Sequence, residues 1–178
     1  LKDAVVGLGR EGSPFQHFCT AEIVSDQGLM ITNHHCAFGM IQAHSSLEHN
    51  YLRDGFWAKS LQEELMNPGT TASILVRMED VTDKINAALN DNMSEQERAE
   101  KIKEISRKLE AEAVKGTNLQ ANIKPYFNGN QYFMSIFKIF RDVRLVGAPN
   151  SAIGKFGGDT DNWTWPRHTG DFSVLRIY

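Results

Sequence analysis

The chain has 178 residues, with 19 Lys and Arg against 22 Asp and Glu, which gives a formal net charge of -3 at pH 7. This balance argues against a nucleic-acid-binding protein, because such proteins usually gather a basic excess on one face. Hydrophobic residues make up 41% of the chain, yet no run approaches the roughly 18 apolar residues that a membrane helix needs. The composition therefore predicts an ordinary globular protein with no nucleic-acid partner and no membrane span.

The chain starts at Leu1 and not at Met. We interpret it as a processed or truncated piece, so that its first residues indicate nothing about the destination of the protein. Its length corresponds to about one domain.

Four segments have the composition of β-strands. Residues 19–33 contain two apolar runs around the turn residues 25–28, which is typical of a β-hairpin. Residues 72–78 predict another strand, and residues 133–148 predict one or two more. Residues 171–178 predict a last strand that is entered directly from an aspartate.

The segment 79–116 is rich in helix formers instead. Ser94 and Glu97 have the spacing of a capping box, and Gly116 is expected to end the helix that follows. Thr82 could cap a shorter helix before it. Apolar residues recur at three- and four-residue steps, which is typical of an amphipathic helix: Ala99, Ile102, Ile105, Leu109 and Ala113. We expect a helical insertion in a β-rich domain, with a separate α+β domain as the alternative.

The chain has two cysteines, Cys19 and Cys36, 17 positions apart. In an oxidising compartment they would form a disulfide worth about 3 kcal/mol. Alternatively, they could bind zinc together with His17, His34 and His35. Neighbouring side chains of an extended segment point to opposite faces, so His34 and His35 could not easily share one ion. The pattern favours the disulfide, and a zinc site remains the minor alternative.

His35 and Asp171 are the strongest candidates for chemistry. His35 lies just after the end of a strand and directly precedes a cysteine that can tie it back to the start of the hairpin. A general base of a chymotrypsin-like serine hydrolase needs such an imidazole on a turn, with a carboxylate to orient its second ring nitrogen. Asp171 lies at the start of an apolar strand, where its carboxylate could meet the imidazole.

Three stretches resemble the S46 family of bacterial dipeptidyl peptidases, which are serine exopeptidases. They are Ile31-Thr-Asn-His-His-Cys36, the segment from His44 to Ala58, and the long stretch from Phe156-Gly-Gly-Asp to His168-Thr-Gly-Asp-Phe172. The resemblance implies a mixed, mainly β fold, the first half of a chymotrypsin-like double β-barrel, with residues 1–178 as the N-terminal part of the peptidase domain. It also implies release of dipeptides from the free N-terminus of peptides, a periplasmic or cell-surface location, and a homodimer.

The resemblance assigns roles to individual residues. His35 is similar to the general base of the family and Asp171 to its orienting acid. Asn162 and Trp163 match the pair that grips the terminal ammonium of the substrate, a task that an amide carbonyl and an indole face can perform. No cofactor and no metal are expected.

The sequence contains no Gly-x-Ser-Gly motif, in which the nucleophilic serine of this class lies. In the family that serine lies far downstream, so we expect this chain to be inactive alone. The alternative is a module with a trypsin-like barrel that binds peptide N-termini without cleaving them.

Overall fold

The structure is a computed structural model that describes residues 2–90, 92–154 and 170–178. Contacts between Cα atoms divide the chain into two compact units. Unit 1 comprises residues 1–73 and 140–178, and unit 2 comprises residues 74–139.

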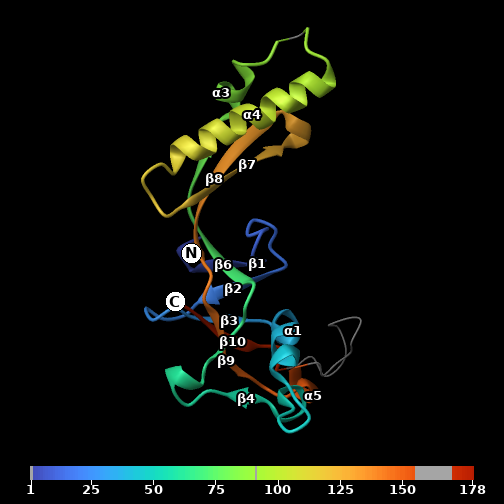
Figure 1. Ribbon diagram of the computed structural model, residues 1–178, viewed down its shortest axis with the longest axis vertical. Coiled ribbons are helices and arrows are strands. Elements are labelled where there is room, and N and C mark those ends of the chain that lie inside the picture. The colour runs from blue at the N-terminus through green and yellow to red at the C-terminus, as the bar shows by residue number, and fades with distance from the viewer. Residues whose placement is uncertain (1, 91, 155–169) are drawn as a thin grey trace. The chain divides into compact units, whose positions relative to one another are not determined.

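Unit 1 is built on antiparallel strands (Figure 1). In chain order the strands are β1 (Val5–Arg10), β2 (Cys19–Ile23), β3 (Leu29–Thr32), β4 (Phe56–Trp57), β5 (Leu65–Met66), the first residues of β6 (Thr70–Asp80), β9 (Val143–Ala148) and β10 (Ser173–Ile177). Their order in the sheet is β4-β9-β10-β3-β2-β1-β6, and β5 also pairs with β9. The helices are α1 (His34–His44), α2 (Tyr51–Asp54) and α5 (Ser151–Gly154), with the short 3₁₀ helices Lys2–Ala4 and Leu61–Glu63.

The structure confirms the hairpin predicted for residues 19–33. β2 and β3 pair antiparallel, with Glu22 opposite Ile31. The Ser25 hydroxyl accepts a hydrogen bond from the backbone N–H of Leu29 at 3.1 Å and so closes the turn. Gly28 adopts a φ of +72°, and a Cβ at this position would lie 2.5 Å from the carbonyl oxygen of Ile177. The turn therefore needs a glycine both for its backbone angle and for the close approach of β10.

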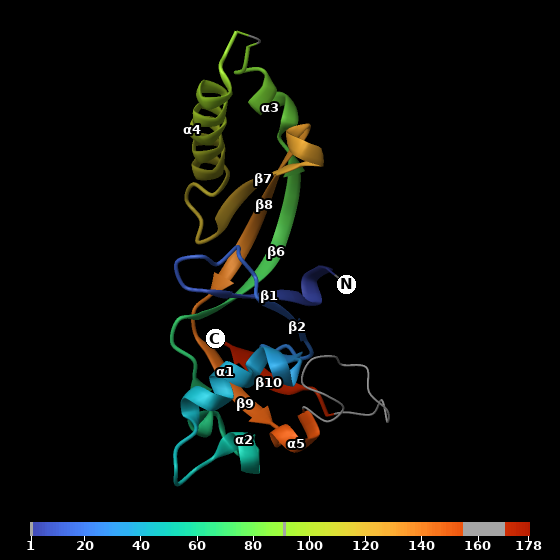
Figure 2. The ribbon, with the colours of Figure 1, turned by 90° about the vertical axis from the view of Figure 1, so that its right-hand side faces the viewer.

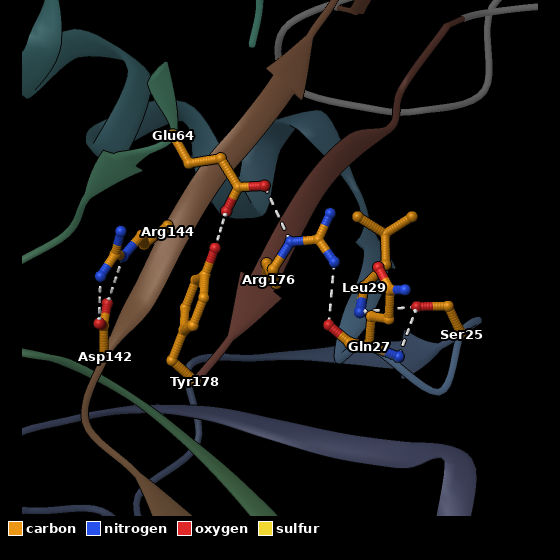
Figure 3. Close-up of polar contacts among 8 residues, drawn as sticks. All are labelled: Ser25, Gln27, Leu29, Glu64, Asp142, Arg144, Arg176 and Tyr178. Carbon is orange, nitrogen blue, oxygen red and sulfur yellow. Dashed lines mark hydrogen bonds and ion pairs between the residues drawn. The ribbon is translucent and has the colours of Figure 1, made fainter. Parts of the chain in front are cut away.

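β10 lies in the middle of the sheet and is held at its end by polar contacts (Figure 3). It pairs with β3 on one side and β9 on the other. Arg176 Nε donates to one oxygen of Glu64 at 2.8 Å, and the Tyr178 hydroxyl donates to the other at 2.8 Å. The Glu64 side chain is 2% exposed, so these two donors satisfy a buried carboxylate. Burial and the nearby carboxylate raise the pKa of Tyr178. The contacts fix the strand whose other end leads back to Asp171.

A disulfide joins Cys19 at the start of β2 to Cys36 in the first turn of α1, with 5.9 Å between the Cα atoms. This is the pairing that the sequence favoured over zinc. The bond ties the helix that carries His35 to the sheet beside it.

We expect the double substitution Cys19→Ala and Cys36→Ala to lower the free energy of unfolding by about 3 kcal/mol, because a closed loop of this length restricts the unfolded chain. Urea unfolding of the two proteins under oxidising conditions would measure the difference. As a control, the dithiol form of the unsubstituted chain should unfold at a similar urea concentration to the double variant. Equal midpoints for the oxidised protein and the double variant would contradict the expectation.

Unit 2 combines two helices with three strands. It contains the rest of β6, α3 (Thr82–Asn86), α4 (Glu95–Ala113), β7 (Gln120–Tyr126), the 3₁₀ helix Phe127–Gly129 and all but the last residue of β8 (Gln131–Phe140). The strand order is β6-β8-β7, and α4 lies beside the β7–β8 hairpin (Figure 2). The capping box of Ser94 and Glu97 is present, and its hydrogen bonds lower the pKa of Glu97.

The core of unit 2 joins the helices to the hairpin. Its buried members are Val81, Ile85, Tyr132, Met134 and Ile136. The apolar residues predicted from the helical periodicity pack against this cluster at Ile102, Ile105, Leu109 and Ala113. Both expected helices are therefore present, but β7 was not predicted, and the helices pack against strands.

The structure confirms the mixed, mainly β class with antiparallel pairing. Closure into a chymotrypsin-like barrel stays a prediction. None of the helices in the described ranges has the length and apolar character that crossing a bilayer requires.

Candidate active site

The structure brings His35 and Asp171 together although they are 136 positions apart in the chain. His35 Nδ1 lies 2.8 Å from Asp171 Oδ2. The backbone N–H of His35 donates to the other carboxylate oxygen at 3.1 Å. The Asp171 side chain is 16% exposed and that of His35 is 53% exposed. A largely covered carboxylate thus holds one nitrogen of an imidazole whose other nitrogen can reach a ligand.

His35 lies in the first turn of α1, whereas the sequence predicted a turn after the strand. The helix begins directly after β3, with Asn33 as its N-cap residue. Successive residues of a helix point about 100° apart, so His34 and His35 still diverge. The helix supplies a more rigid support for the imidazole than a turn would.

Asn33 is a site residue that the sequence analysis missed. Its side-chain N–H₂ group donates to Asp171 Oδ2 at 3.2 Å and to the backbone carbonyl of Asp171 at 3.3 Å. Together with the backbone N–H of His35, it orients the carboxylate toward the ring. The sequence held no local signal for this role, because the Asn33 side chain makes no N-cap hydrogen bond and its partner lies 138 positions away.

The other histidines of the possible zinc cluster point elsewhere. His34 is fully buried, and its Nε2 lies 3.2 Å from the hydroxyl of Ser151. His17 Nε2 lies 2.7 Å from the hydroxyl of Ser73. A ring nitrogen of His35 and the two cysteine sulfurs do lie within 4.8 Å of one another. The sulfurs are bonded to each other, however, and only a thiolate is a good zinc ligand.

Asn162 and Trp163, the predicted ammonium-binding pair, lie outside the described residues. The described residues next to that segment are Gly154 and Gly170. A Cβ on Gly154 would lie 2.5 Å from the ring of His34, so α5 packs tightly against the residue before His35. The backbone N–H of Gly170 donates to the carbonyl of Ile153 at 3.1 Å, which brings the two flanks of the segment together next to Asp171.

The geometry supports proton transfer by His35. When Nδ1 carries the hydrogen that Asp171 accepts, Nε2 is an acceptor and can take a proton from a hydroxyl. Within the described ranges, the hydrogen bonds of the His35 side chain go to Asp171. The arrangement can therefore act as a base with its orienting acid, with the exposed side of the imidazole open to a reacting group.

Comparison with known proteins confirms the family resemblance of the sequence. The family model Peptidase S46 matches residues 3–178. A dipeptidyl-peptidase 7 of Capnocytophaga gingivalis is 46% identical over 178 residues, which are 100% of this chain and 24% of that protein. An Asp/Glu-specific dipeptidyl-peptidase of the same organism is 49% identical over 164 residues, 92% of this chain and 23% of the relative.

Solved structures agree with the sequence comparison. The crystal structure of Porphyromonas endodontalis DPP11 in complex with the dipeptide Arg-Glu matches with a TM-score of 0.78 and 46% identity, over 100% of this chain and 26% of that one. The chain thus spans about a quarter of the length of the relatives that it matches. The matched residues include His35 and Asp171, and the chain belongs to the peptidase family S46.

Proposed function

We propose that the whole protein is a serine-type dipeptidyl peptidase that releases dipeptides from the free N-terminus of peptides. The observation that carries this proposal is the distance of 2.8 Å between His35 Nδ1 and Asp171 Oδ2, together with the exposure of the His35 ring. The relatives support the reaction class, because they are named dipeptidyl peptidases. One relative is named Asp/Glu-specific dipeptidyl-peptidase and the other dipeptidyl-peptidase 7. The names share dipeptide release and differ in the rest, so we propose dipeptide release without a side-chain preference.

In this proposal His35 is the general base and Asp171 its orienting acid. His35 Nε2 takes the proton of a serine hydroxyl while the serine oxygen attacks the carbonyl carbon of the second peptide bond. The imidazolium, stabilised by Asp171, then gives that proton to the leaving amine as the bond breaks. A water molecule releases the dipeptide from the serine ester by the same route. The serine and its oxyanion hole are proposed to lie downstream of residue 178 in the parent polypeptide.

We also propose that Asn162 and Trp163 grip the terminal ammonium of the substrate. An amide carbonyl accepts a hydrogen bond from the cation, and an indole face attracts it by about 0.5–2 kcal/mol. This support comes from the family resemblance of the stretch 156–172. Such a grip would set the distance from the N-terminus to the cleaved bond.

The proposed location is the periplasm or the cell surface, and the proposed assembly of the full-length enzyme is a homodimer. The disulfide of Cys19 and Cys36 supports an oxidising compartment.

We expect residues 1–178 alone to release no dipeptides, because a base and an acid without a nucleophile have no means to attack a peptide bond. The measurement is dipeptide release from an unmodified peptide by the isolated chain and by the full-length protein at equal concentration. Circular dichroism would verify that the isolated chain is folded.

A fluorophosphonate should label the full-length protein on a serine outside residues 1–178 and abolish its activity. Dipeptide release by the isolated chain that the reagent inhibits would contradict the proposed division of the site. A full-length protein that binds peptide N-termini but is neither labelled nor active would favour a non-catalytic binding module.

A further inference from the structure

A groove of about 770 Å³ opens beside His35 in unit 1. Its lining includes the disulfide of Cys19 and Cys36, and the side chains of Arg10, Phe18, Met40 and Pro68. These residues come from the end of β1, the start of β2, one face of α1 and the segment before β6. The groove is a continuous surface on the disulfide side of the imidazole.

Among the described residues, His35 is the one residue that both lines the groove and contacts Asp171. Asp171, Asn33 and helix α5 do not line the groove. The carboxylate contacts Asn33 and His35, and the residue before it, Gly170, bonds to Ile153 of α5. The imidazole therefore has two distinct neighbourhoods, one at Asp171 and one at the disulfide.

A dipeptidyl peptidase makes different demands on the two sides of the cleaved bond. On the acyl side it must accommodate two residues and hold their terminal ammonium, and we proposed Asn162 and Trp163 for this grip. On the other side it must accept a peptide of any length, and this part needs an open surface. The groove has the size and the position for this second part, since it starts at the base that protonates the leaving amine.

The charge of the groove indicates which peptides it favours. Of the described residues that line it, Arg10 alone carries a formal charge at neutral pH. Its guanidinium lies 5.4 Å from the centre of the Phe18 ring, which restrains it within the groove. Among the described residues, the Arg10 guanidinium forms no ion pair with a carboxylate. A guanidinium that lies over an aromatic ring can still donate hydrogen bonds from its N–H edge to a carboxylate. Phe18, Met40 and Pro68 add apolar surface around it.

We propose that this groove binds the part of the peptide that follows the cleaved bond, and that Arg10 favours a carboxylate in that part. This inference depends on the proposed function and adds to it the chemistry of the leaving peptide. Arg10 is a specificity residue here and takes no part in the proton transfer.

The test uses the full-length enzyme and peptides that share their first two residues. Each peptide carries either Asp or Lys at one position, which is the third, the fourth or the fifth. All other residues after the second are neutral. At one of these positions we expect kcat/KM to be about 2- to 5-fold higher for Asp than for Lys. This ratio corresponds to the free energy that an exposed ion pair contributes. The preference should shrink as salt is added, because salt screens exposed charges.

Charge reversal separates the role of Arg10 from a structural effect. Arg10→Glu should invert the preference, Arg10→Gln should remove it, and Arg10→Lys should retain part of it. The matched control is Arg53→Glu, an exposed arginine of α2 that does not line the groove, which should preserve the preference. If Arg10→Glu folds poorly, as thermal unfolding would reveal, the Gln and Lys variants still decide the outcome.

Two results would overturn the inference: equal kcat/KM for Asp and Lys at all three positions, or a preference that Arg10→Glu and Arg10→Gln leave unchanged. The proposed function is tested separately with a dipeptidyl arylamide, whose leaving group contains no amino acid. If the unsubstituted enzyme cleaves the arylamide, dipeptide release stands even when the groove assignment fails. If it cleaves neither substrate, the proposed function itself fails.

Discussion

Replacing His35 with alanine in the full-length enzyme is expected to lower kcat by at least about 10⁴-fold, because the variant lacks the group that removes the proton from the nucleophile. The fold should persist, since the His35 side chain is 53% exposed and contributes no core packing. The measurement is steady-state hydrolysis of a dipeptidyl arylamide, together with the thermal midpoint of both proteins.

The matched control for this variant is His49→Ala. His49 is also exposed, belongs to unit 1 and stacks beside Tyr51 with ring centres 6.3 Å apart. Its loss should leave kcat within a factor of a few. An active His35→Ala enzyme would remove His35 from the mechanism and make His34 the next candidate, although the buried ring of His34 contacts Ser151.

Replacing Asp171 with asparagine should lower kcat by about 10⁴-fold while the geometry stays intact. The carboxylate accepts hydrogen bonds from His35 Nδ1, the backbone N–H of His35 and the amide of Asn33. An asparagine has one acceptor oxygen, so its N–H₂ group must face one of these donors. When it faces the ring, Nδ1 becomes the acceptor and Nε2 carries the hydrogen, which leaves no base for the serine.

Hydrolysis measured across the pH range, with a crystal structure of the variant, would test this expectation. Asp54→Asn, an exposed carboxylate that pairs with Arg53, is the matched control and should retain full activity. If Asp171→Asn kept more than about a tenth of the kcat of the unsubstituted enzyme, Asp171 would not orient a catalytic imidazole.

Local features of the fold could be predicted because they depend on neighbouring residues. In the turn of the β2–β3 hairpin, Ser25 accepts a hydrogen bond from Leu29 four residues on, and Gly28 supplies the positive φ. The capping box of α4 depends on Ser94 and Glu97, which are three residues apart. Propensity and spacing are sufficient for such elements.

β7 and the start of α1 could not be predicted in the same way. β7 has Pro125 near its end and a lysine before it, and it becomes a strand because β8 pairs with it along its whole length. His34 and His35 have modest helix propensity, and the first turn of α1 is held by distant partners: Asp171 accepts the backbone N–H of His35, and the disulfide ties Cys36 to β2.

The sequence by itself determined which residues could supply a base and an acid, since a His-Cys pair after a strand and an aspartate before another strand belong to few kinds of site. Only the tertiary structure decided that His35 and Asp171 meet, that Asn33 holds the carboxylate and that Arg10 shares a groove with the imidazole. The physical reason is that contacts across 136 positions depend on how β10 pairs with β3, and this pairing is fixed by the whole sheet.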